Sequence, residues 1–127
     1  MLKRINLAVF CIFYFAAGCN HFWHSAMYVN IIPPYFPFKE FINYASGVLE
    51  MMCSLLMLIR ATRKYAMYVT IILLILFIPA HVYLIQLHGC ATSDFCFAEW
   101  LAWIRLFPFQ FVLIWWAYKT WKISKAI

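Results

Sequence analysis

Glu50 is the residue whose position most strongly suggests chemistry, because it lies midway along the apolar run 41–59. A charge left at the depth of a lipid bilayer costs about 2.5–3.5 kcal/mol on insertion scales, so an acid there needs a partner, a proton or a water-filled cavity. The polar residues that could join it from the other apolar runs are Asn20, His21, His81, Arg105 and Gln110. We expect them to form one polar cluster around a ligand pocket, with Glu50 and Arg105 in the same network.

The polar residues of the first two apolar runs follow the spacing of single helical faces. One face carries Ala17, Asn20, His21 and His24, and the other carries Asn43, Ser46, Gly47, Glu50, Cys53 and Ser54. Small residues also let two helices approach closely, so the alternative for the second stripe is plain helix packing. Packing accounts for Ser46 and Gly47 but leaves Glu50 unexplained.

Gln110 fits the cluster less simply than Arg105 does. On an ideal helix of 3.6 residues per turn it lies about 140° around from Arg105. A kink at Pro108 would change that angle, and the alternative is that Gln110 bonds across to a neighbouring helix. Pro79 and Pro108 each leave a backbone carbonyl without its helical donor, which a buried polar group can satisfy.

The four histidines do not form a recognisable metal motif. There is no His-Glu-x-x-His run, Cys-x-x-Cys pair or Cys-x-x-Cys-His attachment site, and we expect no metal and no thiol-disulfide catalysis. The alternative is a haem held by His21 and His81 from two helices at similar depth. Hydrogen-bonded bundle residues or ligand contacts are the more common role of such histidines.

Composition places the chain in a membrane. Its 127 residues are 68% hydrophobic and 11% charged, which is more apolar than a soluble domain of this size can bury. Four stretches are long enough to cross about 30 Å of hydrocarbon as helix, namely about 5–22, 41–59, 65–87 and 100–121. The sequence therefore predicts a single all-α domain, a four-helix transmembrane bundle.

The net charge of +6 does not indicate a nucleic-acid partner, because the placement of the basic residues fits a membrane topology. Eight of the ten basic residues fall on one side of the predicted bundle: Lys3, Arg4, Arg60, Arg63, Lys64, Lys119, Lys122 and Lys125. The positive-inside rule then predicts that both termini lie in the cytoplasm. The competing interpretation is a lipoprotein signal cleaved before Cys19, which would remove the first helix.

Two segments on the outer side contain residues that constrain the backbone, prolines in one and cysteines in the other. Ser25 can cap a short interfacial helix that Pro33, Pro34 and Pro37 then break, which predicts a proline-rich lid on the outer surface. Cys90 and Cys96 lie in the second outer loop, where an oxidising compartment would let them form a disulfide.

Several motifs in order resemble the DoxX-like family of small bacterial membrane proteins. They are Ala17-Gly18-Cys19-Asn20-His21-Phe22, Ile32-Pro33-Pro34-Tyr35-Phe36-Pro37, Ser46-Gly47-Val48-Leu49-Glu50, Phe77-Ile78-Pro79-Ala80-His81-Val82-Tyr83, and Arg105-Leu106 with Pro108 and Gln110. His81 stands where that family's motif is expected to have asparagine. The resemblance implies a four-helix fold, a location in the inner membrane of a bacterial cell, and a link to quinol or thiosulfate:quinone oxidoreductase chemistry.

The expected function is that of a small membrane subunit in a quinone-linked redox system, which holds a quinone-like or other amphipathic small molecule. Its partners would be the lipid bilayer, a redox protein and further copies of itself. The chain has no nucleotide loop and no nucleophile-base pair, so we do not expect it to catalyse electron transfer alone. Two alternatives remain: a scaffold whose buried charges only fix helix register, and a minimal small-molecule transporter.

Overall fold

The computed structural model describes all residues 1–127 and is an all-α bundle, which confirms the predicted fold class. Four helical segments are long and apolar enough to cross a membrane, so the chain is a multi-pass membrane protein. The helices are α1 (Leu2–Trp23), α2 (Ser25–Ile31), α3 (Lys39–Leu58), α4 (Arg63–Leu76), α5 (Ile78–Gln86), α6 (Glu99–Ile104), the π-helix η1 (Arg105–Gln110) and α7 (Phe111–Ser124). The expected span 5–22 falls inside α1, which starts earlier because its basic first turn continues into the interfacial region.

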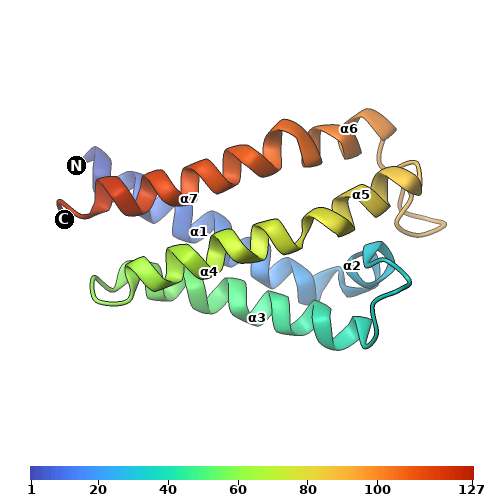
Figure 1. Ribbon diagram of the computed structural model, residues 1–127, viewed down its shortest axis with the longest axis horizontal. Coiled ribbons are helices and arrows are strands. Elements are labelled where there is room, and N and C mark those ends of the chain that lie inside the picture. Colours follow the sequence, from blue (N-terminus) through green and yellow to red (C-terminus); the bar gives the residue numbers. More distant parts are fainter.

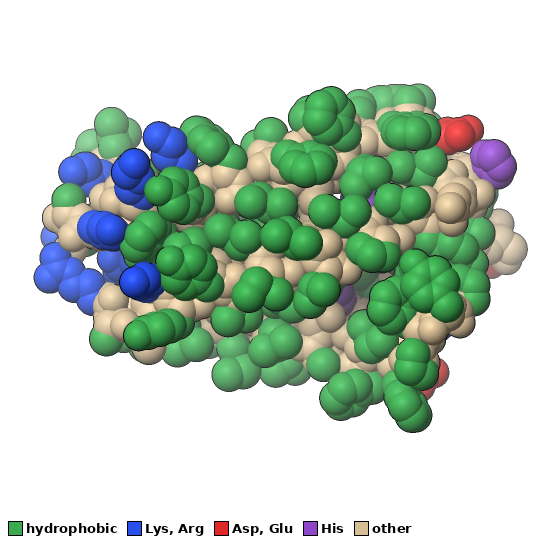
Figure 2. Space-filling view, viewed as in Figure 1, with side chains coloured by type: hydrophobic (Ala, Val, Ile, Leu, Met, Phe, Trp, Pro, Cys, Tyr) green, Lys and Arg blue, Asp and Glu red, His purple; other side chains and the backbone are tan.

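The bundle has two different ends (Figure 1). Both termini and the turn 59–62 lie at one end, called the terminal end here, and α2 and the loop 87–98 lie at the other, called the loop end. Lys and Arg side chains gather at the terminal end, whereas hydrophobic side chains cover the surface between the ends (Figure 2). Large apolar side chains that stay exposed all along the spans indicate a surface that faces lipid.

The four spans close into a ring in which α1 packs on α3, α3 on α4, α4 on α7, and α7 back on α1. The tightest crossing is at Gly18 and Gly47. A Cβ added to Gly18 would lie 2.8 Å from the Gly47 carbonyl oxygen, and one added to Gly47 would lie 2.9 Å from the Gly18 carbonyl oxygen. Glycine at both positions therefore lets the two backbones touch, and this contact fixes the axial offset between α1 and α3.

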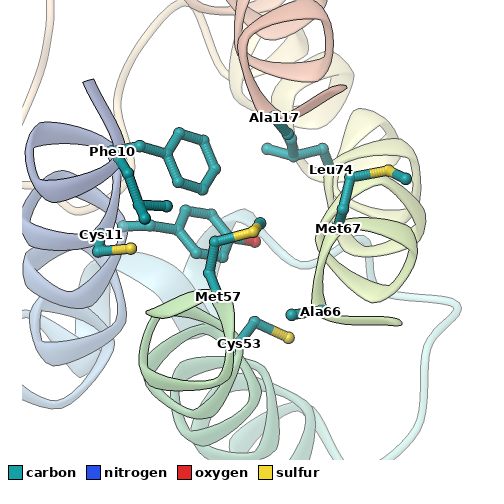
Figure 3. Close-up of a cluster of buried hydrophobic side chains, with 10 residues drawn as sticks. Phe10, Cys11, Cys53, Met57, Ala66, Met67, Leu74 and Ala117 are labelled. Atoms are coloured by element: carbon teal, nitrogen blue, oxygen red, sulfur yellow. The ribbon is translucent and has the colours of Figure 1, made fainter. Parts of the chain in front are cut away.

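The main hydrophobic core fills the half of the bundle toward the terminal end. Figure 3 shows its side chains, which point toward one another from α1, α3, α4 and α7. Phe10 from α1 packs edge-on against Trp116 from α7, with 5.0 Å between the ring centroids. Met57 and Met67 are almost completely buried between the helices. Ala66 and Ala117 supply the small side chains that let α4 and α7 approach this core. Close packing of this half leaves any sizeable cavity to the loop half of the bundle.

Arg63 holds the terminal end together. Its guanidinium is buried and donates to the carbonyl oxygens of Met57 at 2.7 Å, Leu58 at 3.0 Å and Ser124 at 2.9 Å. These carbonyls belong to the last turns of α3 and α7, which lack intrahelical donors and carry partial negative charge. Arg63 therefore satisfies two helix ends at once, a role beyond the topological charge that the sequence indicated.

Two interruptions open the bundle toward the loop end. The third span breaks at Phe77, two residues before Pro79, and the fourth becomes a π-helix that contains Pro108 and an extended Phe107 at φ −139°, ψ 123°. Proline lacks the N–H that would continue the helical ladder. Beyond these breaks α5 packs on α2, α4, α6 and η1 and makes no extended contact with α1 or α3. The helices therefore separate in the loop half.

The loop end is covered by the two segments that the sequence had singled out. Helix α2 begins at Ser25, and the chain turns at the buried Pro33 before it enters α3. In the second loop, Cys90 and Cys96 are joined by a disulfide. Gly89, at φ +85°, brings its carbonyl to the Phe97 N–H at 2.8 Å, and a side chain there would meet the Phe97 backbone.

Candidate functional site

A cavity of about 350 Å³ lies in the loop half of the bundle, where α1, α2 and α3 face α5 and η1 across the separation. Fifteen of its twenty-four lining residues are hydrophobic, so its wall is mostly apolar. The polar side chains that line it are Tyr14, His21, Tyr28, Asn43, Ser46, Glu50, His81, Arg105 and Gln110. The cavity therefore gathers five of the six residues expected in the polar cluster, and Asn20 lies just behind it.

The Glu50 side chain contacts His21. The Glu50 Oε2 atom lies 3.1 Å from the His21 Nε2 atom, and both side chains are buried. His21 comes from the last turn of α1 and Glu50 from the middle of α3, which the Gly18 and Gly47 crossing brings to the same level. Glu50 thus has a polar partner, which offsets the free-energy cost of placing an acid at this depth.

Asn43 determines which ring nitrogen of His21 carries a hydrogen. The Asn43 Nδ2 donates to the His21 carbonyl oxygen at 3.0 Å, so its Oδ1 must be the atom that faces the His21 Nδ1 at 2.9 Å. An amide oxygen only accepts, and therefore Nδ1 is the donor. His21 Nε2 then faces the Glu50 carboxyl group, and two acceptors would meet at 3.1 Å unless one proton lies between them. The pair carries no net charge in either arrangement of that proton.

Tyr28 covers the pair of His21 and Glu50 on the side of the loop end. Its ring stacks on the imidazole of His21 with 4.1 Å between centroids, and its hydroxyl accepts a hydrogen bond from Asn20 Nδ2 at 2.8 Å. The Asn20 Oδ1 in turn contacts His24 Nδ1 at 2.5 Å. Burial raises the pKa of Tyr28, and the Asn20 hydrogen bond and nearby Arg105 oppose that increase. Tyr28 therefore stays a neutral phenol that closes the loop end of the cavity.

Gln110 and His81 occupy the opposite wall. Gln110 is 2% exposed and its Nε2 donates across the bundle to the Leu74 carbonyl oxygen, close to the break between α4 and α5. This is the cross-helix bond that the sequence offered as an alternative for Gln110. His81 is also buried, but its Nδ1 has no hydrogen-bond partner. His81 thus presents an unused polar atom beside the cavity.

Glu50 and Arg105 line the same cavity as His21 and His81, but they form no direct ion pair. Glu50 contacts His21 instead, and the Arg105 guanidinium lies over the Phe97 ring at 5.9 Å from its centroid. The physical reason is that His21 already lies against the Glu50 carboxyl group.

The chain matches a known family model over most of its length. This model, described as "Domain of unknown function (DUF8561)", covers residues 10–121. The chain belongs to this family. It has no match among curated proteins or solved structures.

Membership of DUF8561 shows that the resemblance to DoxX-like proteins was wrong, since the matching model is not a DoxX model. The motifs that suggested it owe much of their form to helix packing. Gly18 and Gly47 serve the close crossing of α1 and α3, and Pro79 marks a break in a span. Features of this kind suit many membrane bundles and identify no particular family.

The haem alternative does not fit this DUF8561 structure. His21 has both ring nitrogens engaged, Nδ1 with Asn43 and Nε2 with Glu50, so neither is free to bind iron. Across the whole chain, no group of three or more His, Cys, Asp or Glu side chains is placed to hold a metal ion.

Sequence reasoning missed three residues of this site. Asn43 was visible on the polar stripe of α3 but was not assigned a role. Tyr28 was not singled out, because its stacking on His21 depends on the turn after α1. Tyr14 lines the cavity with a buried hydroxyl that has no partner. Its one available signal was its position seven residues before His21, on the same face of α1.

Proposed function

We propose that this DUF8561 protein binds a membrane-soluble amphipathic small molecule in the cavity of its loop half. The observation that carries the proposal is a buried polar atom beside the cavity, His81 Nδ1, that has no hydrogen-bond partner. Leaving such an atom unpaired costs about 1–3 kcal/mol in proteins, and a ligand hydroxyl, carbonyl or amide would recover it.

The apolar wall supports a ligand that is mostly hydrocarbon. A volume of about 350 Å³ falls in the range of small-molecule sites, which combine hydrophobic walls with a few placed polar groups. Such a ligand is soluble in the bilayer that surrounds the four spans. The apolar wall and the lipid surroundings therefore suit the same chemical class.

The narrower expectation of a quinone-linked redox subunit has less support. It came from the DoxX resemblance, and the chain belongs to another family. A quinone is an amphipathic molecule with two carbonyl acceptors, so it remains one ligand worth testing. The binding proposal does not depend on it.

The orientation we propose follows from the charges. Basic residues gather at the terminal end (Figure 2), and the positive-inside rule then places both termini in the cytoplasm. In a bacterial inner membrane the loop end would face outward, where the Cys90–Cys96 disulfide is stable. The cavity would then exchange molecules with the outer leaflet.

A pure scaffold explains less of the site. The contacts of Asn43 and Glu50 with His21 tie α3 to α1, as buried polar groups that fix helix register would. Register alone gives no reason for the free nitrogen of His81 or for an unfilled volume beside it. Ligand binding accounts for both.

The proposal is tested by filling the cavity. Ala17 lines it from α1, whereas its neighbour Ala16 is exposed at nearly the same depth, so Ala17→Phe and Ala16→Phe form a matched pair. Native mass spectrometry of protein released from its own membrane should detect a bound small molecule in the wild type and in Ala16→Phe. Occupancy should fall at least tenfold in Ala17→Phe. Equal occupancy in the two folded variants would refute binding in this cavity.

A further inference from the structure

Arg105 is the one basic residue other than histidine that lines the cavity, and it has no acidic partner. The chain contains four acidic residues. Glu50 contacts His21, Glu99 contacts His88 at 3.6 Å, and Glu40 and Asp94 are exposed residues that form no ion pair. The groups near the guanidinium include the Phe97 ring, the Tyr28 hydroxyl and the His81 imidazole, none of which is an acid.

The charge of the cavity wall can be counted from these contacts. The His21 and Glu50 pair is neutral wherever its shared proton lies, and His81 has no acid beside it that would stabilise a charged form. Arginine remains protonated in proteins, even in apolar surroundings. The cavity therefore carries one uncompensated positive charge next to a low-dielectric bilayer, where an unpaired ion is expensive.

Arg105 lies in the part of the fourth span near the loop end. It follows the start of α6 at Glu99 by six residues, which is about 9 Å along an ideal helix, and a long arginine side chain near a span end can extend its guanidinium toward the headgroups. An anion bound by Arg105 would have the apolar wall formed by Leu73, Leu74 and Leu113 available for an attached chain.

We propose that the ligand has an anionic head, a carboxylate or a phosphate ester, which is bound by Arg105, with an apolar chain in the cavity. This inference rests on the proposed function and narrows its ligand class. A guanidinium presents a planar fork of N–H donors that fits both carboxylate and phosphate oxygens, and the charged hydrogen bonds are about twice as strong as neutral ones. A neutral ligand would leave the charge of Arg105 uncompensated.

The test compares three single-chain probes with the same hydrocarbon: dodecanoate, dodecyl phosphate and dodecanol. Each is titrated by calorimetry into the full-length protein in nanodiscs of neutral lipid, with empty nanodiscs subtracted. At least one anionic probe should bind at least tenfold more tightly than dodecanol, which corresponds to about 1.4 kcal/mol. The stronger of the two anions identifies the head as carboxylate or phosphate.

Two variants assign the preference to Arg105. Arg105→Gln should reduce binding of the preferred anion to the level of dodecanol, and Arg105→Lys, which keeps the charge, should retain part of the preference. Anions and dodecanol bound equally by the wild type, with Ala17→Phe abolishing both, would overturn the anionic head while leaving the proposed function standing. An anion preference unchanged in Arg105→Gln would also overturn it. Absence of cavity binding for every probe would count against both proposals.

Discussion

The Asn43 side chain holds His21 at two points, with its Oδ1 2.9 Å from the His21 Nδ1 and its Nδ2 3.0 Å from the His21 carbonyl oxygen. These contacts fix the amide orientation, and with it the ring nitrogen that donates. The other nitrogen is thereby directed at the Glu50 carboxyl group, 3.1 Å away. Asn43 is thus the residue through which α3 sets the chemistry of the His21 and Glu50 pair.

Replacing Asn43 tests this role. Asn43→Ala removes both contacts and leaves the buried Nδ1 of His21 without an acceptor, so we expect the free energy of unfolding in detergent to fall by about 1–3 kcal/mol. Asn30→Ala, at an exposed position with no side-chain hydrogen bond, is the matched control and should change little. Equal stability of the two variants would show that the contacts with His21 contribute nothing.

A double-mutant cycle tests which residue is the partner of Glu50. Glu50→Gln combined with His21→Phe should show a coupling free energy of about 1–3 kcal/mol, because the two side chains are in contact. Glu50→Gln combined with Arg105→Gln should be additive within about 0.5 kcal/mol, because no ion pair joins them. Strong coupling to Arg105 and none to His21 would indicate a direct pair of Glu50 with Arg105 and contradict the geometry.

Replacing Arg63 even by lysine should lower the stability of the bundle. An ammonium cannot reproduce the fork that donates to three carbonyl oxygens, so Arg63→Lys should lower the free energy of unfolding by about 2 kcal/mol or more. Arg60→Lys makes the same chemical change at an exposed position in the same turn and should leave stability unaltered. Indistinguishable unfolding curves for the two variants would mean that Arg63 does not hold the helix ends.

The proposed orientation predicts the side on which each loop is accessible. Reporter enzymes that work only in the cytoplasm should be active when they are fused to either terminus. In a chain whose five native cysteines are replaced by serine, Ser93→Cys should react with an impermeant thiol reagent from outside. A cysteine at Ala61, in the turn between α3 and α4, should be protected in intact cells. Outward reporters at both termini would reverse the orientation, and the cavity would then exchange with the inner leaflet.

The sequence was a good guide to features that depend on one helix. Helical spacing placed Asn43, Ser46 and Glu50 on one face, and all three line the cavity. Proline positions indicated the breaks near Phe77 and Pro108, since the missing N–H is a local property. The length and apolarity of each run likewise predicted the four spans.

Features that depend on two helices could not be predicted in the same way. Which residue of α1 meets Glu50 is set by the axial offset between α1 and α3, and that offset comes from the contact of Gly18 with Gly47. A periodicity within one helix carries no information about its offset from another. For the same reason the sequence counted Arg63 among the topological charges, although it reaches the last turn of α7, 61 residues away.

The central proposal is that a small amphipathic molecule completes the hydrogen bonding of the cavity. The most direct measurement is an experimental structure of the protein purified from its own membrane in mild detergent. We predict density for an elongated molecule in the cavity, with a polar atom within hydrogen-bond distance of His81 Nδ1. A cavity that is collapsed, or filled by side chains with His81 Nδ1 bonded to a protein group, would contradict the proposal.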